Sequence, residues 1–173
     1  DYKASAAPVN YLLLPATVSL AIPLYEKLDQ LRKNAAAILA GITMETLLSL
    51  GSVFVLALVL KLEHIQYVTL LPKSVTTAIS MDVSAELGGI AALTGAIVIL
   101  TGIAGNLLAE SVCKWFRITD PIAKGIGIGT SSHAIGTSKA LEMGEVEGAM
   151  SGLAIAVAGV LTAVLCPVFA MLM

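Results

Sequence analysis

Long apolar runs alternate along the chain with segments in which polar residues, glycine and proline interrupt the apolar pattern. Runs such as Val53–Leu60 are continuously apolar, without the period-2 alternation of a membrane barrel strand. Because backbone polar groups in lipid must be paired within their own segment, the pattern predicts an all-α integral membrane protein. Three runs reach about 20 residues or more, the length needed to cross a bilayer core. They are Ala35–Leu60, Ile90–Ala109 and Ala149–Met173.

Three further apolar segments differ from plain spanning helices because each contains residues that interrupt a helix. Proline lacks a backbone donor, and glycine adopts conformations closed to other residues. We therefore predict three broken or re-entrant segments, which are Leu12–Tyr25, Ile65–Asp82 and Pro121–Ala140. The residues expected to break their helices are Pro15, Pro72, Gly129 and Gly136.

The broken segments also resemble one another. LPATVSLAIPLY (Leu14–Tyr25) aligns without gaps with LPKSVTTAISMD (Leu71–Asp82) at an offset of 57 residues. The second segment aligns with the third at an offset of 56, which brings Glu86 onto Glu142. Self-similarity at a fixed period indicates a repeat. The predicted unit of about 57 residues is one broken segment followed by one plain helix.

Charges in the connectors indicate how the units are oriented. The connectors Glu26–Asn34 and Glu110–Asp120 carry basic residues and are predicted to be cytoplasmic, whereas Lys61–His64 is near neutral and Asp82–Glu86 is acidic. The second broken segment would then enter and leave from the outer side, and the third would either re-enter from the inner side or cross. If it re-enters, neighbouring units are inverted, which is a common plan of secondary transporters.

Composition supports the membrane assignment and excludes several other classes. Of 173 residues, 57% are hydrophobic and 13% charged, about half the charged share of a soluble domain. The few basic residues form no stripe with aromatic residues, which argues against nucleic-acid binding. The two cysteines form neither a disulfide framework nor a metal motif. We therefore predict no metal, no cofactor and a single domain over residues 1–173.

The stretch PKSVTTAIS (72–80) is the most informative for function. Pro72 restricts Leu71 away from the helical region, so a helix is predicted to begin here. Unpaired N–H groups in its first turns, the charge of Lys73 and nearby hydroxyls would together form an anion site. The alternative is that Lys73 extends to an interface and the hydroxyls bond back to the helix. The hydroxyl residues concerned are Ser74, Thr76 and Thr77.

The second polar stretch is GTSSHAIGTSK (129–139), which contains Lys139 and in which hydroxyl donors come from Thr130, Ser131, Ser132, Thr137 and Ser138. His133 can bind a solute or take up a proton, since ionisable residues inside membrane segments are functional candidates; the alternative is a packing role. The GIGIG run is explained by close helix packing through small residues. Glu45, within an apolar helix, either carries a proton, pairs with a lysine or faces a neighbouring helix as a neutral acid. No orienting acid accompanies His133, so no enzymatic activity is predicted.

These stretches resemble the LrgB/CidB family of bacterial membrane proteins. The signals are LPATVSLAIPLY, LLPKSVTTAISMDVS, and DPIAKGIGIGTSSHAIGTSKALEMGEVEGA (Asp120–Ala149), and the resemblance spans nearly the whole chain. Two departures are Leu14, where the family usually has glycine, and Ala78, where it often has proline. Family members are typically longer, so the resemblance implies a single LrgB-like domain that lacks membrane segments upstream.

The resemblance implies two kinds of function. Bacterial members are described as holin-like or antiholin-like proteins that control murein hydrolase activity and cell lysis with an LrgA/CidA-type partner. A plant chloroplast relative looks like a glycolate/glycerate carrier, and bacterial members have been connected with pyruvate movement. It also implies a multi-pass protein of the bacterial cytoplasmic membrane.

The residues favour a transporter of small monocarboxylates that works by alternating access, with the antiholin-like role as the alternative. Broken helices, hydroxyls and cationic groups suit a small carboxylate, whereas a holin needs only apolar helices that assemble. Glycine-rich faces further predict a homo-oligomer. The predicted substrate-binding residues are Lys73, Ser74, Thr76, Thr77, Ser132, His133, Thr137 and Lys139, with His133 or Glu45 coupling a proton.

Overall fold

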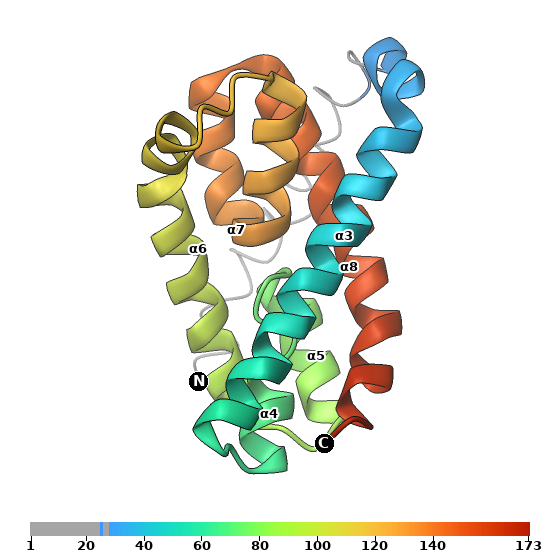
Figure 1. Cartoon of the computed structure of the whole chain (residues 1–173), viewed down its shortest axis with the longest axis vertical. Coiled ribbons are helices and arrows are strands. Elements are labelled where there is room, and N and C mark those ends of the chain that lie inside the picture. The colour runs from blue at the N-terminus through green and yellow to red at the C-terminus, as the bar shows by residue number, and fades with distance from the viewer. Residues whose placement is uncertain (1–24, 26–27) are drawn as a thin grey trace, which may run out of the picture.

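The computed structural model describes residue Tyr25 and residues 28–173, and all elements in this part of the chain are helices (Figure 1). The predicted all-α fold is therefore confirmed. The first broken segment, with Pro15, lies outside the described residues apart from Tyr25. The helices are α3 (Leu28–Leu60), α4 (His64–Leu70), α5 (Thr77–Glu86), α6 (Ala91–Trp115), α7 (Pro121–Met143) and α8 (Glu145–Ala170).

Three of these helices, α3, α6 and α8, are long and apolar enough to cross a membrane. They correspond to the three predicted spans, but each begins or ends several residues away from the predicted limit. Helix α6, for example, continues past Ala109 to Trp115. Hydropathy marks where a helix stops being apolar, whereas backbone hydrogen bonding continues through polar residues that face water. Large apolar side chains on all three remain exposed, such as Leu56, Leu107 and Val160, as expected for surfaces that face lipid.

The second broken segment forms a helical hairpin, here called the α4–α5 hairpin (residues 64–86), which lies in the lower half of Figure 1. Its two ends are held together beside the start of α6. The Thr69 hydroxyl accepts a hydrogen bond from the Ile90 amide at 2.9 Å, and the Thr94 hydroxyl donates to the Thr69 carbonyl at 2.9 Å. Both ends of the hairpin lie at one end of the molecule (Figure 1), and the membrane side inferred from its flanking charges stays a prediction.

The third broken segment, helix α7, turns back at His133, the one residue with non-helical angles inside it. Its two ends lie at the opposite end of the molecule from those of the α4–α5 hairpin, and it fills the upper half of Figure 1. Lys139, near its end, contacts Glu110, near the end of α6. We call residues 121–143 the α7 hairpin. The segment turns back within the molecule, as the re-entrant alternative requires, and the two described units run in opposite directions (Figure 1); its path through a membrane stays a prediction.

Buried apolar contacts hold both hairpins against the long helices. Tyr67 of α4 is fully buried, and its hydroxyl donates to the Phe169 carbonyl of α8 at 2.8 Å. Around it lies an apolar cluster, here called the lower core, formed by Leu50, Val53, Ala57, Tyr67, Val68, Leu71, Val83, Cys166 and Ala170. A second cluster joins α3 to α8 through residues such as Ile42 and Met150. The two hairpins are thus fixed by packing on opposite sides of a central space.

The GIGIG run confirms the prediction of close packing for two of its three glycines. A Cβ atom at Gly125 would collide with the backbone oxygen of Glu147, and one at Gly129 with the backbone oxygen of Ser151. A Cβ at Gly127 would meet nothing within 4 Å. Small residues let backbones approach in membrane helices. The first arm of the α7 hairpin therefore lies directly on α8.

Candidate functional site

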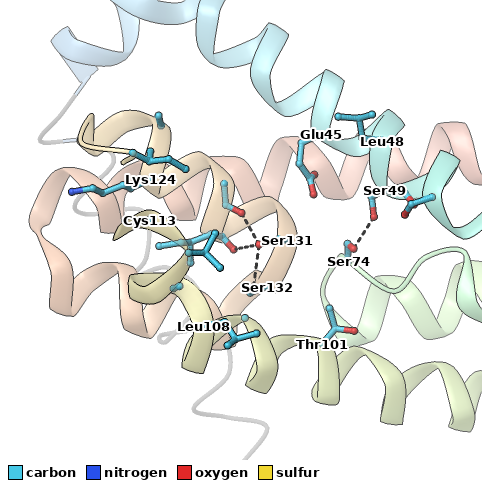
Figure 2. Close-up of a pocket in the computed structure, with 18 of the residues that line it drawn as sticks. Glu45, Leu48, Ser49, Ser74, Thr101, Leu108, Cys113, Lys124, Ser131 and Ser132 are labelled. Carbon is cyan, nitrogen blue, oxygen red and sulfur yellow. Dashed lines mark hydrogen bonds between the residues drawn. The ribbon is translucent and has the colours of Figure 1, made fainter. Parts of the chain in front are cut away.

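The tips of the two hairpins meet beside α3 and α6, where they enclose a cavity of about 550 Å³ (Figure 2). Its walls mix apolar side chains with an unusual number of polar groups for the interior of a membrane domain. The polar residues in its lining are Glu45, Ser49, Ser52, Lys73, Ser74, Thr101, Lys124, Ser131 and Ser132. The cavity therefore brings together groups from both predicted polar stretches.

Lys73 is the cationic group at the tip of the α4–α5 hairpin. Its Nζ donates to Ser74 Oγ at 2.9 Å and to Ser49 Oγ at 3.5 Å, and the two serine hydroxyls share a hydrogen bond of 2.8 Å. Among the described residues, no carboxylate forms an ion pair with Lys73, although Glu45 lines the same cavity. A half-buried cation without a direct counter-ion attracts an anionic ligand.

The position of Lys73 follows from a turn that the sequence analysis misplaced. The predicted helix start at Pro72 is wrong, because α5 begins at Thr77. Leu71 is helical (φ −55°, ψ −49°) and its amide donates to the Tyr67 carbonyl at 3.0 Å, so the α4 turn extends up to the proline. Pro72 has no amide with which to continue that ladder, and it therefore ends α4 rather than starting α5.

A loop between the two short helices consequently carries the polar tip. The Ser80 hydroxyl closes this loop by donating to the Pro72 carbonyl at 2.6 Å. Ser74 lies in the loop and faces the cavity. Thr76 instead flanks the start of α5, and the Thr77 methyl lies 3.6 Å from the position that a Cβ of Gly95 would occupy. The structure therefore places Ser74 in the site but leaves Thr76 and Thr77 outside the cavity lining.

The tip of the α7 hairpin is at His133 (φ 41°, ψ −142°), not at the predicted breaks Gly129 and Gly136. Gly129 is helical and accommodates α8. Gly136 lets the two arms of the hairpin approach, because a Cβ there would stand 2.5 Å from that of Ser132. These two glycines therefore allow close packing, whereas the chain reverses at His133, whose side chain is held by another helix.

That anchor is a hydrogen bond to α6. His133 is 3% exposed and its Nε2 donates to the Val98 carbonyl at 2.9 Å. Thr137 is also buried, and it bonds the Ser151 hydroxyl of α8 at 2.7 Å. Neither residue lines the cavity. The packing alternative therefore describes His133 better than substrate binding, and Ser131 and Ser132 are the residues that this tip presents to the cavity.

Lys139 lies outside the cavity, on the second arm of the α7 hairpin. Its Nζ contacts Glu110 and Glu142, each at 3.0 Å. The hydrogen bonds that Lys139 donates to Glu110, and to a lesser degree to Glu142, raise the pKa of its amine above the ordinary value. Its charge is therefore compensated locally, and it pairs with neither Glu45 nor a ligand at Lys73.

The sequence analysis missed several cavity residues, of which Ser49 and Ser52 could have been found. They follow Glu45 by four and seven residues and therefore share its helix face. A polar stripe on one face of an apolar helix indicates contact with something other than lipid. Ser131 lies in the polar stretch 129–139, among the donors that the sequence analysis noted, whereas Thr101 carried no comparable signal. Among the described residues, no group of three metal-ligating side chains was found.

Comparisons with known proteins agree with the predicted resemblance. The chain matches the LrgB-like family over residues 1–172. It is 38% identical over 169 residues to the "Antiholin-like protein LrgB" of Bacillus cereus (strain B4264), covering 98% of this chain and 74% of that protein. The protein of the same name from Bacillus anthracis (strain A0248) matches with the same identity and coverage. No solved structure matches the chain.

Proposed function

The chain belongs to the LrgB-like family of multi-pass membrane proteins, and we propose that it carries small monocarboxylates across the membrane through the cavity at Lys73. The observation that supports this function is the cation at the meeting point of two inverted hairpins. Lys73 forms no direct ion pair with a described carboxylate, although Glu45 lies near it in the same cavity, and hydroxyls from both hairpins and from α3 line the space around it. Inverted repeats with broken helices that meet near the membrane midplane are typical of secondary transporters.

The chemistry of the cavity defines the ligand class. A carboxylate would accept hydrogen bonds from Lys73 and from the hydroxyls of Ser49 and Ser74, which already bond to one another. A hydroxyl or keto group on the same ligand would reach Ser131 or Ser132 across the cavity. The volume of about 550 Å³ lies within the usual range for small-molecule sites. Pyruvate, glycolate and glycerate carry this pair of functional groups.

Glu45 is the candidate for proton coupling, because it lines the cavity, whereas His133 is engaged by α6. A carboxylate beside the substrate anion would bind a proton when the anion enters, since two like charges close together are unfavourable. Glu45→Gln, which mimics the protonated acid, should therefore abolish the response of uptake to a pH gradient while leaving substrate binding measurable. Equal stimulation by the gradient in both proteins would contradict this role.

The comparisons favour a second function, because the relatives are named antiholin-like proteins. On this proposal the chain restrains or tunes an oligomeric pore, together with an LrgA-type partner, and thereby influences cell lysis. Such a protein needs stable apolar helices and an assembly surface, but no cation inside its helical core. The two proposals therefore differ in what they require of Lys73.

Reconstitution of the full-length protein in liposomes distinguishes them. We expect saturable uptake of labelled pyruvate, glycolate or glycerate that is lost in Lys73→Gln. Lys33→Gln, which removes an exposed lysine of α3 away from the cavity, should leave uptake unchanged. Leakage of solutes regardless of their charge, equal in wild type and Lys73→Gln, would refute the carrier and support the antiholin-like function.

A further inference from the structure

A second cavity adjoins the first at the end of the molecule where α6 leads into α7. It has a volume of about 770 Å³ and is called here the vestibule. Its lining comprises Glu110, Cys113, Lys114, Arg117, Ile118, Thr119, Lys124, Glu142 and Met143. Cys113, Ile118 and Lys124 line both cavities, so these three residues form the junction between the vestibule and the Lys73 site.

Charge in the vestibule is arranged to leave cations facing the space. Its two acidic residues, Glu110 and Glu142, both contact Lys139, which lies outside the lining, at 3.0 Å, and Glu110 also lies 3.5 Å from Lys114. The lining thus carries three basic and two acidic residues, and the acidic ones are shared with a lysine outside it. Lys124 at the junction lies 3.9 Å from Glu147, and the two side chains are 22% and 11% exposed, so Lys124 can attract a ligand carboxylate while it stays beside Glu147.

The opposite end of the Lys73 site is closed. Beyond Ser74 the next space has a volume of only about 10 Å³ and is bounded by Leu50, Leu71 and Val75, which is about the minimum for one water molecule. Below it lies the lower core with Tyr67 fully buried. In the described part of the chain, the Lys73 site therefore adjoins the vestibule and, through Glu45, Ala123 and Gly127, a cavity of about 460 Å³ between α3 and α7, and it is closed toward the α4–α5 end.

We propose that the vestibule, whose lining carries three basic residues, is the access path by which carboxylates reach Lys73, and that Lys124 is the cationic side chain that holds them at the junction. This inference rests on the proposed carrier function for its ligand, but not for the existence of the path. An anion drawn into the vestibule would be attracted to Lys124 at the junction and then pass between α6 and α7 to the hairpin tips. A cation at a narrow junction also selects against cationic solutes by repulsion.

The two native cysteines provide a matched test within one molecule. Cys113 is 8% exposed and lines both cavities at the junction, whereas Cys166 is 0% exposed in the lower core and lines neither cavity. Wild-type full-length protein in membrane vesicles is treated with the small, anionic, membrane-impermeant reagent 2-sulfonatoethyl methanethiosulfonate. We expect peptide mass mapping to find Cys113 modified only when the reagent is on the face next to Lys114 and Arg117, and Cys166 unmodified.

Lys124→Gln tests the cation at the junction. It should slow modification of Cys113 by the anionic reagent about three- to tenfold, because local charge concentrates ions of opposite sign. The rate with neutral methyl methanethiosulfonate should stay unchanged, which would show that the passage remains open. Equal rates of the anionic reaction in wild type and variant would overturn the role of Lys124.

The experiments distinguish failure of the access-path proposal from failure of the carrier proposal. An unreactive Cys113 in protein that takes up pyruvate would overturn the access path and leave the carrier standing. Sided, charge-selective modification of Cys113 in protein without uptake would support the path and refute the carrier. If both proposals hold, Lys124→Gln should raise the KM of uptake severalfold with little change in maximal rate, whereas Lys73→Gln abolishes uptake.

Discussion

The α4–α5 hairpin and the α7 hairpin occupy equivalent places in two inverted units, but they reverse direction by different means. The first turns through a loop of six residues, 71–76, that exposes Lys73 and Ser74 to the central cavity. The second turns at His133 alone, and the adjoining Ser131 and Ser132 face the cavity. The first tip therefore contributes a charge and the second contributes hydroxyls.

This difference indicates that the two tips contribute different properties to the site. A loop leaves backbone and side-chain groups free to bind a ligand, whereas a one-residue reversal depends on contacts that hold it in place. In the α7 hairpin these contacts are the His133 bond to α6 and the close approach of Gly129 to α8. We infer that the α4–α5 tip provides affinity for the ligand and that the α7 tip provides a rigid wall.

The largest expected effect is on substrate binding, to which the two tips should contribute unequally. Lys73→Gln should weaken pyruvate binding at least tenfold, because a hydrogen bond to a charged group contributes about 1.5–3 kcal/mol. Ser132→Ala removes one neutral donor and should weaken binding about fivefold, equivalent to roughly 1 kcal/mol. Titration calorimetry of the purified protein measures both. A larger loss of binding in Ser132→Ala than in Lys73→Gln would contradict the inference that the α4–α5 tip provides the affinity for the ligand.

The next effect tests the rigidity of the α7 hairpin. Gly129→Ala places a Cβ against the backbone of Ser151, which cannot move aside as a flexible side chain would. We expect a loss of stability of about 1–3 kcal/mol, typical of overpacking. Gly127→Ala, two residues away in the same run, meets nothing within 4 Å and is the matched control. Thermal unfolding in detergent compares the two, and equal melting temperatures would contradict this packing.

A smaller effect concerns the reversal itself. His133→Ala and His133→Gly both lose the bond to Val98, but only glycine relieves the positive φ of 41°. Because such strain costs an L-residue about 1–3 kcal/mol, the glycine variant should be the more stable of the two. The same unfolding assay decides the order. A more stable alanine variant would mean that the turn changes shape when the histidine is removed.

The smallest effect is expected at Lys139, which the sequence analysis placed among the binding residues and the structure pairs with Glu110 and Glu142. Lys139→Gln should leave pyruvate binding unchanged and barely shift the melting temperature. Its raised pKa means that the ion pairs stabilise the protein at neutral pH and are lost only as the pH rises above lysine's ordinary 10.5. If Lys139→Gln weakened pyruvate binding as strongly as Lys73→Gln, Lys139 would have to contribute to the binding site.

The sequence by itself determined the class of the protein, its three spanning helices and the two described segments that break. Hydropathy and the presence of proline or glycine are local properties, so they can be read without knowing which residues meet. Lys73, Ser74 and Ser132 were identified for the same reason, since polar groups in apolar segments are conspicuous wherever the chain places them.

Only the tertiary structure decided where each hairpin reverses and which polar groups share the cavity. Pro72 ends α4 rather than starting α5 because Tyr67 anchors that turn in the lower core, and His133 forms the second tip because α6 supplies its partner. The cavity joins Ser49, Lys73, Thr101 and Ser132, which lie far apart along the chain. Contacts of this kind depend on how helices pack, and packing is set by the fit of whole surfaces rather than by any single segment.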